Sequence, residues 1–388
     1  MKSSFQVQFH RPKFLKSGDN PALKKVFQKE KDKPQPDANN RVLQDQALGQ
    51  QDKAIRHRLF GGLVIWKKNN TSQSSSSSLP DIASASESKA PKELQRKIDE
   101  VDYKKLAEFD PDFAEYAKIV KHDAVRGLQP SLATTELDIK HLPLIVEMEN
   151  ARNPGLNLCC FKSLEECIKE LKEIKEKHQS GNYRIIYPPY KFESDHHMML
   201  DVKLDPDPLK PMSIVLFEPS FVVDIGEAVK DLRENLDNPR ISTVVTGTQY
   251  SDTDCVMFAL NHALKSFKTY SEFAGKIHEN NENRVIRKNQ ELPAVFFKHT
   301  HSSSKARAGK DNSQGEIRVN SEKSKNPDAQ TLTQRINAYR TTRFNKKTEK
   351  TDTYSTSIEG FRLQEIKRVA DYLERKSASS PHPQAPAS

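Results

Sequence analysis

A serine-rich stretch divides this chain and confines its core to the residues that follow. Residues 69–90 contain the run Ser74–Ser78 and further serines, but few apolar side chains. Such a stretch buries too little apolar surface to offset the conformational entropy lost on ordering. We therefore expect residues 1–90 to form a disordered N-terminal segment that ends in this linker, with the fold beginning near residue 91.

Several classes of protein are disfavoured by what the chain lacks. It contains no run of about 18 apolar residues, so no membrane span is expected. Its first ten residues lack the apolar core of a secretory signal peptide. The four cysteines, at positions 159, 160, 167 and 255, form neither a disulfide framework nor a paired CxxC zinc pattern. We therefore expect the protein to occupy a reducing compartment and to bind no metal.

The positive charge of the chain lies in its first 70 residues and in its C-terminal part, while the middle is net acidic. The net charge is +9, and residues 296–350 hold 13 Lys or Arg against 5 Asp or Glu. Such an excess suits nucleic acid or a compact polyphosphate. Few aromatic residues that could stack on bases, Tyr339 and Phe344, stand among these cations. The pattern therefore does not favour nucleic acid and suits a polyphosphate at least as well.

The periodicity of apolar residues predicts a mixed α/β or α+β core. Residues 163–182 have a helical stripe and a capping-box pattern of Ser163 and Glu166 at the start. A first helical region at 91–109, a basic helix at 331–344 and a final amphipathic helix at 357–376 are also expected. Short β-branched runs predict strands. These runs occupy residues 182–190, 196–204, 212–220 and 241–249.

Cys255 stands where a strand, a loop and a helix follow one another. A cysteine acts as a nucleophile only as the thiolate, which the partial positive charge of a helix N-terminus favours. It would also need a base, an orienting carboxylate and an oxyanion donor. His196 or His197, Glu218 and Gln249 are the candidates for these roles. The alternative interpretation is an inert cysteine that fills the core.

A series of motifs gives the chain a resemblance to a known family. They are "MENARNPGLNL", "HHMMLDVKL", "IVLFEPS", "TQYSDTDCVMFALNHALKSFK", "LPAVFFKHT" and "IEGFRLQEIKRV". In this order they resemble the YopJ family of type III secreted effectors, and most of all its HopZ-like branch from plant pathogens. The resemblance extends from about Lys92 to the last helix, and leaves the first 90 residues as a variable segment.

The resemblance implies a fold and an activity. The fold would be related to the cysteine proteases of ubiquitin-like proteins, with an added helical regulatory region. Residues 1–90 would serve secretion and translocation, 91–345 would form the catalytic core, and 346–388 a regulatory helix and a disordered tail. The enzyme would pass through the type III secretion machinery into the host cell. There it would transfer acetyl groups from acetyl-CoA to Ser, Thr or Lys of host proteins and suppress immunity.

Site residues follow from the same resemblance. The base matches His196, with Asp201 retained five positions on and His197 as the neighbouring alternative; Glu218, Cys255 and Gln249 match the carboxylate, the nucleophile and the oxyanion donor. Inositol hexakisphosphate, the expected activator, would bind Lys97, Arg152, Arg362, Lys367 and Arg368. Acetyl-CoA would contact Lys298, Arg318 and Asn261, and Lys298 would also be the site of autoacetylation.

Three other interpretations stay open on the sequence alone. The same triad could hydrolyse conjugates of a ubiquitin-like protein, because both reactions pass through an acyl-thiol. The chain could also be a non-catalytic decoy that binds host proteins. A metal site built on His299, His301 and the His196–His197 pair is a weaker third, because no carboxylate or thiol supports it at ligand spacing.

Overall fold

The structure is a computed structural model, described here for residues 88–177, 179–189, 196–207, 209–220, 225–286, 292–301, 331–345 and 350–379. All of these residues belong to one unit of the chain, Ala83–Ser388. The serine-rich stretch up to residue 87 and Arg318 therefore lie outside the described residues. Within the described part, no helix is both long enough and apolar enough to cross a membrane.

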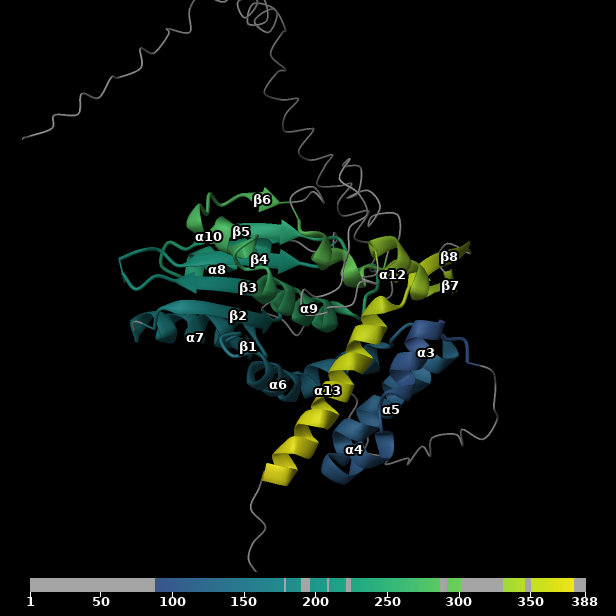
Figure 1. The fold of residues 1–388 in the computed structure, drawn as a ribbon. Coiled ribbons are helices and arrows are strands. Elements are labelled where there is room, and N and C mark those ends of the chain that lie inside the picture. Colours follow the sequence, from purple (N-terminus) through teal and green to yellow (C-terminus); the bar gives the residue numbers. More distant parts are fainter. Residues whose placement is uncertain are drawn as a thin grey trace, which may run out of the picture. The chain divides into compact units, whose positions relative to one another are not determined.

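A six-stranded mixed sheet forms the centre of the fold, in the sequential order β1 to β6 (Figure 1). β2 and β3 are antiparallel, as are β3 and β4, while the pairs β1–β2, β4–β5 and β5–β6 are parallel. The strands are β1 (Leu158–Cys160), β2 (Gly181–Tyr187), β3 (Met198–Leu204), β4 (Ser213–Glu218), β5 (Arg240–Val245) and β6 (Val285–Ile286). The predicted strands at 182–190, 196–204, 212–220 and 241–249 correspond to β2, β3, β4 and β5.

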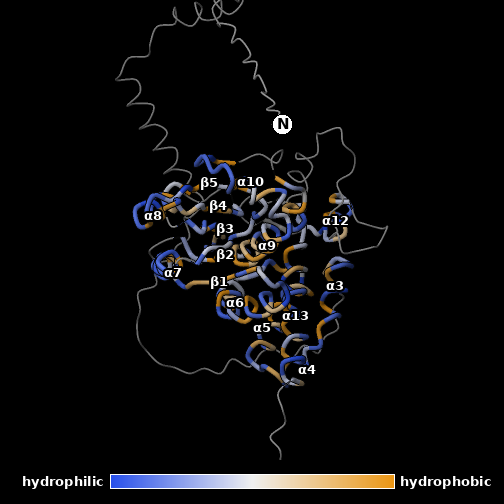
Figure 2. The backbone as a smooth tube through the Cα atoms, turned by 60° about the vertical axis from the view of Figure 1, so that its left-hand side comes forward, coloured by the Kyte–Doolittle hydropathy of each residue, from blue (hydrophilic) through white to orange (hydrophobic). Residues whose placement is uncertain are grey.

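Helices cover both faces of this sheet, and the alternation along each strand decides which residues meet them. On β3, Met198, Leu200 and Val202 pack with α7 (Leu164–Glu176) and α8 (Ile225–Asn235), which we call the α7–α8 face. Met199 points to the opposite side, the α9 face, where it joins the core around α9 (Cys255–Lys268). The outer helices α7 and α8 are mainly hydrophilic (Figure 2), as expected for helices with only one buried stripe.

The predicted helix at 163–182 is confirmed as α7. The Ser163 side chain accepts a hydrogen bond from the backbone N–H of Glu166 at 3.1 Å. The Glu166 carboxylate reaches back one residue further than in a capping box, to the backbone N–H of Lys162. α9 differs from α7 because it is buried on nearly all sides, so the helix that begins at Cys255 is a core helix.

A helical layer completes the α9 face (Figure 1). The expected first helical region forms two helices, and two further helices that periodicity did not reveal follow them. These helices are α3 (Lys92–Asp99), α4 (Tyr103–Phe109), α5 (Pro111–Arg126) and α6 (Leu132–Arg152). α6 has no clear apolar stripe, since Thr135, Asp138 and Glu149 occupy buried positions on it. Short α10 (Ala274–Glu279) and the 3-10 helix η1 (Ala294–His299) follow α9.

The C-terminal region differs in part from the sequence prediction. The basic helix expected at 331–344 is only half correct: α12 (Leu332–Ala338) is helical, but β7 (Arg340–Asn345) follows at once and pairs with β8 (Lys350–Ser355). β-Branched Thr341 and Thr342 favour the extended form there. The final helix is confirmed as α13 (Ser357–Ser379), and it buries Phe361, Ile366 and Val369 against the helical layer.

Candidate active site

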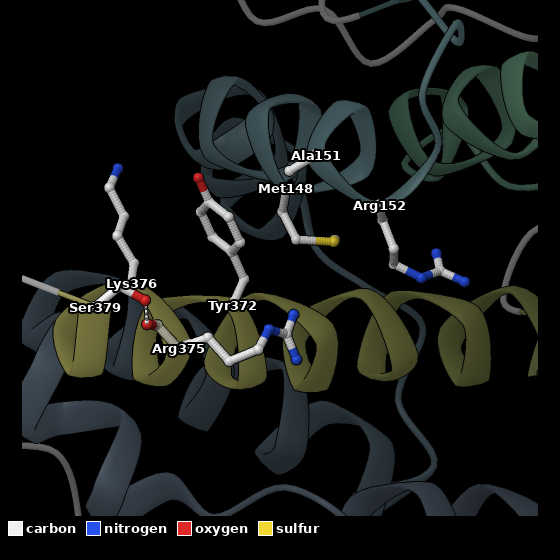
Figure 3. A pocket seen from close by; sticks show the side chains of 7 residues that line it. All are labelled: Met148, Ala151, Arg152, Tyr372, Arg375, Lys376 and Ser379. Carbon is white, nitrogen blue, oxygen red and sulfur yellow. Dashed lines mark hydrogen bonds between the residues drawn. The ribbon is translucent and has the colours of Figure 1, made fainter.

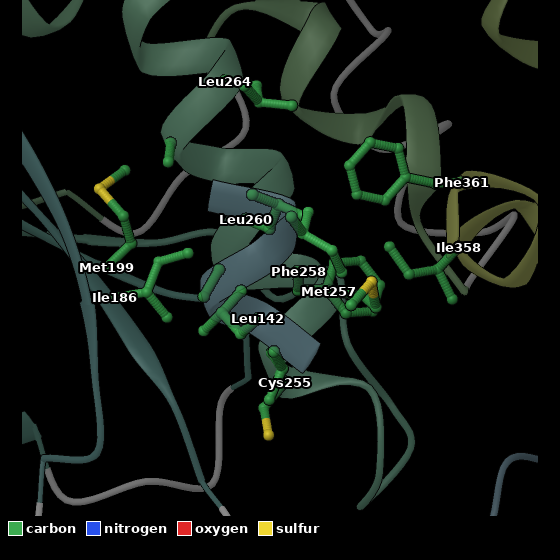
Figure 4. Close-up of a cluster of buried hydrophobic side chains, with 14 of the residues drawn as sticks. Leu142, Ile186, Met199, Cys255, Met257, Phe258, Leu260, Leu264, Ile358 and Phe361 are labelled. Carbon is green, nitrogen blue, oxygen red and sulfur yellow. The ribbon is translucent and has the colours of Figure 1, made fainter. Parts of the chain in front are cut away.

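Cys255 is the first residue of α9, at the edge of the sheet where β4 and β5 end. Because these two strands are parallel, Glu218 at the end of β4 lies beside Val245 at the end of β5. The loop from β5 to α9 folds back over the same edge, and the backbone N–H of Gln249 donates to the Pro219 carbonyl at 2.9 Å. Cys255 is buried, and its sulfur points away from the apolar side chains around α9 (Figure 4).

The antiparallel pairing of β3 with β4 brings a histidine to this edge. Met199 pairs with Phe217, so the residues just before β3 lie beside the end of β4. His196 Nε2 is 2.9 Å from Glu218 Oε2. The other carboxylate oxygen of Glu218 accepts from the backbone N–H of Ser220 at 2.6 Å. Glu218 is fully buried, and these two donors compensate for the loss of its hydration.

Opposing effects act on the His196 imidazole. Burial by itself lowers the pKa of His196, but side-chain hydrogen bonds with Cys255 and Glu218, and the negative charges of both, raise this pKa to about 10. The balance therefore favours the protonated ring at neutral pH. The structure thus brings together His196, Glu218 and Cys255, in the arrangement that an acyl-transfer nucleophile requires. His197, the neighbouring candidate for the base, is also buried.

Gln249 lies in the loop that connects β5 to Cys255 at the start of α9. Its side chain is buried, and the amide nitrogen donates to the Ser251 carbonyl at 2.7 Å. One of its two N–H groups is thus used within the loop, while its Oε1 has no hydrogen-bond partner among the described residues. Its role as an oxyanion donor stays a prediction.

Asp201 does not contact the triad. It is buried on the α9 side of β3, where it accepts from Arg184 at 3.2 Å and lies 3.1 Å from His278 Nε2. Ser266 on α9 donates to the same carboxylate. Burial alone would raise the pKa of Asp201, but His278, Arg184 and Ser266 hold it below the ordinary value. Asp201 therefore fixes β2, β3, α9 and α10 to one another.

Seven cations from six elements crowd together on the α9 face, and we call them the basic cluster. They are Lys97, Arg152, Lys265, Lys268, Lys298, Arg335 and Arg368. Burial first, and then the charges of Arg335, Lys268, Arg368 and Lys97, lower the pKa of Lys298 to about 8. Burial first, and then the charges of Lys298, Lys268, Arg335 and Arg368, place the pKa of Lys265 well below its ordinary value. Mutual repulsion of this strength marks a site suited to a polyanion.

Sequence reasoning missed Lys265, Lys268 and Arg335. The first two lie four and seven residues after Asn261 on α9, a spacing that puts all three on one side of the helix. Arg335 lies in the segment predicted as a basic helix. These spacings were the signals that could have found them.

Arg362 lies apart from the basic cluster, and its contacts give no support to its predicted place in a phosphate site. It is 1 % exposed, and its guanidinium donates to Asp138 at 2.7 and 2.9 Å and to Asp254 at 2.7 Å. Two buried carboxylates thus already neutralise this cation. Lys367 is half-exposed and pairs with Asp371 one turn on along α13, at 2.7 Å.

Three of the predicted phosphate-binding residues form ion pairs with carboxylates. Arg152 and Arg368 donate to buried Glu149 at 2.6 and 3.2 Å, and Lys97 donates to Glu100 at 2.8 Å. Asn261 is buried on α9, and neither side-chain atom has a hydrogen-bond partner among the described residues. A polar ligand near α9 would therefore find an amide without competing contacts.

A pocket of about 500 Å³ lies between α6 and α13 (Figure 3). It is lined by Met148, Ala151, Arg152, Tyr372, Arg375, Lys376 and Ser379. Of the predicted site residues only Arg152 reaches it, so this pocket borders the basic cluster and is separate from the triad. In the described part of the chain, no group of His, Cys, Asp or Glu is arranged to hold a metal ion. His299 Nδ1 instead lies 2.9 Å from the Ser357 carbonyl.

Comparison with known proteins gives a consistent result. The model of the family described as YopJ Serine/Threonine acetyltransferase matches residues 113–368. The serine/threonine-protein acetyltransferase HopZ1a of Pseudomonas syringae pv. syringae is 30% identical over 296 residues, 64% of this chain and 78% of HopZ1a. A serine/threonine-protein acetyltransferase of Sinorhizobium fredii is 23% identical over 177 residues, 45% of this chain and 66% of that protein.

Two solved structures share the fold. The crystal structure of HopZ1a in complex with IP6 and CoA superposes with a TM-score of 0.62 at 28% identity, covering 73% of this chain and 99% of that one. The structure of AvrA delL154 with IP6 and CoA has a TM-score of 0.54 at 22% identity, covering 66% and 98%. The expected α/β core with its helical addition is therefore confirmed. The chain belongs to the YopJ family of serine/threonine acetyltransferases.

Proposed function

We propose that this protein transfers the acetyl group of acetyl-CoA to Ser, Thr or Lys side chains of host proteins, through an acetyl-enzyme on Cys255. One observation carries the proposal. The ring of His196 is hydrogen-bonded to buried Glu218 at 2.9 Å and to Cys255 at the start of α9. A base, its orienting carboxylate and a nucleophile at a helix N-terminus together form the constellation needed for covalent acyl transfer.

In the first half-reaction, His196 holds the proton of the Cys255 thiol and the thiolate attacks the thioester carbonyl. The new bond joins Cys255 Sγ to the acetyl carbon, and the bond to the CoA sulfur breaks. The proton on His196 then goes to the departing CoA thiolate. Glu218 stabilises the imidazolium between these steps, and the backbone N–H groups at the start of α9, with Gln249, would stabilise the oxyanion.

In the second half-reaction, the hydroxyl or amine of the acceptor attacks the acetyl-enzyme. His196 takes the acceptor's proton, the Sγ–acetyl bond breaks, and the proton returns to Cys255. The same three residues thus serve both halves with their roles reversed. The hydrogen bond from Nε2 to Glu218 leaves the other ring nitrogen for the proton that is exchanged.

The basic cluster supports inositol hexakisphosphate as the activator. When bound, this ligand would supply several phosphate charges among lysines that otherwise repel one another. Lys97, Arg152 and Arg368 stay candidates from the sequence, and Lys265, Lys268 and Arg335 join them. Lys367 stays a candidate at the border, where its charge acts on Glu100. Arg side chains among the donors allow bidentate contacts with phosphate oxygens.

Lys298 and Asn261 are proposed to contact acetyl-CoA, and Lys298 to be autoacetylated. A lysine is a nucleophile only when neutral, and a pKa of about 8 gives Lys298 a neutral fraction near physiological pH that an ordinary lysine lacks. Asn261 offers a buried amide without partners among the described residues. Arg318, the third candidate for acetyl-CoA, stays a proposal from the family resemblance.

Mass spectrometry of the purified protein tests the proposal. After incubation with acetyl-CoA and inositol hexakisphosphate, we expect a gain of acetyl groups on the protein. Cys255→Ala should abolish the gain, while Cys159→Ala, on β1 and away from the triad, should retain it. Absence of any acetylation of the wild-type protein, together with cleavage of a ubiquitin-like conjugate, would favour the protease alternative. Equal acetylation of the Cys255→Ala variant would refute the acetyl-enzyme.

Delivery is proposed from membership of the family. We propose that the protein leaves the bacterium through the type III secretion machinery, that residues 1–90 direct this export, and that it suppresses immunity inside the host cell. Fusing residues 1–90 to a reporter enzyme that is active only in host cytoplasm would test this. Reporter activity in cells infected with a secretion-competent strain, but not with a secretion-deficient one, is the expected result. Equal signals from both strains would contradict it.

A further inference from the structure

We propose that Arg362 is a positioning residue for Cys255: from the C-terminal helix α13 it holds the carboxylate of Asp254 away from the start of α9. The triad is thereby completed only when α13 is docked. The inference rests on the proposed function and adds a residue that acts through its neighbour rather than on the substrate. Four observations support it.

The first concerns Asp254, which immediately precedes Cys255. It occupies the N-cap position of α9, where an aspartate normally accepts a hydrogen bond from the helix backbone. Its side chain makes no such bond here. Instead, Oδ1 accepts from Arg362 at 2.7 Å and Oδ2 accepts from Ser251 at 2.5 Å. The Asp254 carboxylate therefore does not cap the first-turn N–H groups of α9, whose partial positive charge favours the adjacent thiolate.

The second observation is that two carboxylates hold the Arg362 guanidinium in place through Nε and Nη2. Its guanidinium is fully buried and donates through two nitrogens to Asp138 on α6, whose carboxylate also accepts from Tyr116 on α5 at 2.6 Å. Asp138 thus anchors Arg362, and Arg362 in turn anchors Asp254. A planar guanidinium can bridge two carboxylates in this way, whereas a lysine ammonium on a flexible stem cannot fix both.

The third observation is the balance of charge next to the thiol. Burial raises the pKa of Asp254, but the charge of Arg362 and the hydrogen bonds from Ser251 and Arg362 lower it below the ordinary value, so the carboxylate is ionised. His301 Nε2 lies 3.5 Å from Asp254 and 2.8 Å from the Tyr354 hydroxyl. Its Nδ1 accepts from the backbone N–H of Tyr250. Without Arg362, a buried anion adjacent to Cys255 would lose its main counter-charge and oppose the thiolate.

The fourth observation is the path from α13 to the basic cluster. Arg368 of the basic cluster lies six residues after Arg362 on the same uninterrupted helix. Phe361 beside Arg362 and Ile366 between the two arginines are buried in the α9-face core, and Figure 4 shows Phe361 and Ile358 near Met257 and Phe258 of α9. A ligand that holds Arg368 therefore also favours the packing that places Arg362 on Asp254.

Alkylation of Cys255 by iodoacetamide, followed over pH, tests the inference without requiring acetyl transfer. Arg362→Met removes the positive partner of Asp254, so the midpoint of alkylation should move up by about one pH unit. Asp254→Asn removes the negative group, so its midpoint should move down. The kcat of Arg362→Met should fall at least about tenfold with an unchanged KM for acetyl-CoA. Arg362→Lys should restore only part of the loss.

The control is Lys105→Met, which removes an exposed contact of α4 with α13, the 2.6 Å pair with Glu374. This variant should alkylate like the wild type. If Arg362 served folding alone, Arg362→Met and Asp254→Asn would both have a lower Tm. Their alkylation midpoints would stay unchanged or move in the same direction, and this result would overturn the inference. If Arg362→Met does not fold, the downward shift in Asp254→Asn still decides. Failure of the wild type to be acetylated would refute the proposed function but would leave these alkylation shifts intact.

Discussion

The dependence of His196 on Glu218 gives a prediction with a calculable magnitude. A rise of the His196 pKa from the ordinary 6.5 to about 10 corresponds to about 5 kcal/mol of preference for the charged ring. Two anions, Glu218 and Cys255, share this effect after burial has opposed it. Because burial opposes the shift, the two anions together supply more than this net preference, so Glu218 supplies at least about 2 kcal/mol if they contribute equally.

Glu218→Gln keeps the size and a hydrogen-bond acceptor but removes the charge. We expect the pKa of His196 to fall to about 8 or below and kcat to fall between about 10- and 100-fold, because the imidazolium that forms in each half-reaction is less stable. A histidine with a raised folded-state pKa stabilises the fold fully below pH 6.5 and loses this contribution as the pH rises toward 10. The variant should therefore lose less of its stability between pH 7 and 10 than the wild type.

Titration of the histidine ring signals by NMR measures the pKa directly, with His196→Gln to assign the resonance. Glu234→Gln is the matched control, because Glu234 is an exposed carboxylate on α8 that pairs with Lys230 far from the triad. Unaltered titration of His196 in Glu218→Gln would refute the reasoning. It would mean that the carboxylate orients the ring but does not hold its proton.

Three further outcomes are expected. Burial and neighbouring cations lower the pKa of Lys298 to about 8, so binding of inositol hexakisphosphate at pH 8 should raise it and take up protons. Binding enthalpies measured in Tris and HEPES should therefore differ, and equal values would contradict this. Arg368→Ala should weaken this binding by about 10- to 100-fold in calorimetry, while Lys105→Ala should not. Asp201→Asn leaves Arg184 buried without its carboxylate, so urea unfolding should show a loss of about 3–5 kcal/mol; a loss below about 1 kcal/mol would exclude the buried ion pair.

The geometry of the candidate active site was predictable because it depends on strand ends. Apolar alternation located β3, β4 and β5, and the motifs of a known family identified the polar residue at the end of each. Pairing then left little freedom for the placement of His196 and Glu218, since adjacent strands set their positions within a few ångströms. The order of these residues along the chain was therefore enough to predict most of the candidate site.

The partners of buried charges were not predictable in the same way. Arg362 looks like any other cation on an amphipathic helix, and only the fold shows that it meets Asp138 and Asp254, which are 224 and 108 residues away. Helix α6 was missed for a related reason. It buries Asp138 and Glu149 at positions where a periodicity argument requires apolar side chains. Charges that neutralise one another inside a protein leave no pattern in either segment alone.

The two faces of the sheet consequently differ in what stabilises them. The α7–α8 face is closed by apolar side chains, whereas the α9 face includes buried ion pairs and a repelling basic cluster. Without a polyanion, the cost of that repulsion falls on the helices of the α9 face, because the cations come from α3, α6, α9, η1, α12 and α13. Loosening of α13 would separate Arg362 from Asp254 but leave His196 and Glu218 in place, since both belong to the sheet edge. The base and its carboxylate would then keep their positions, while Cys255 would lose the contact that holds the neighbouring Asp254. Control by a polyphosphate would therefore act on Cys255 rather than on the whole triad.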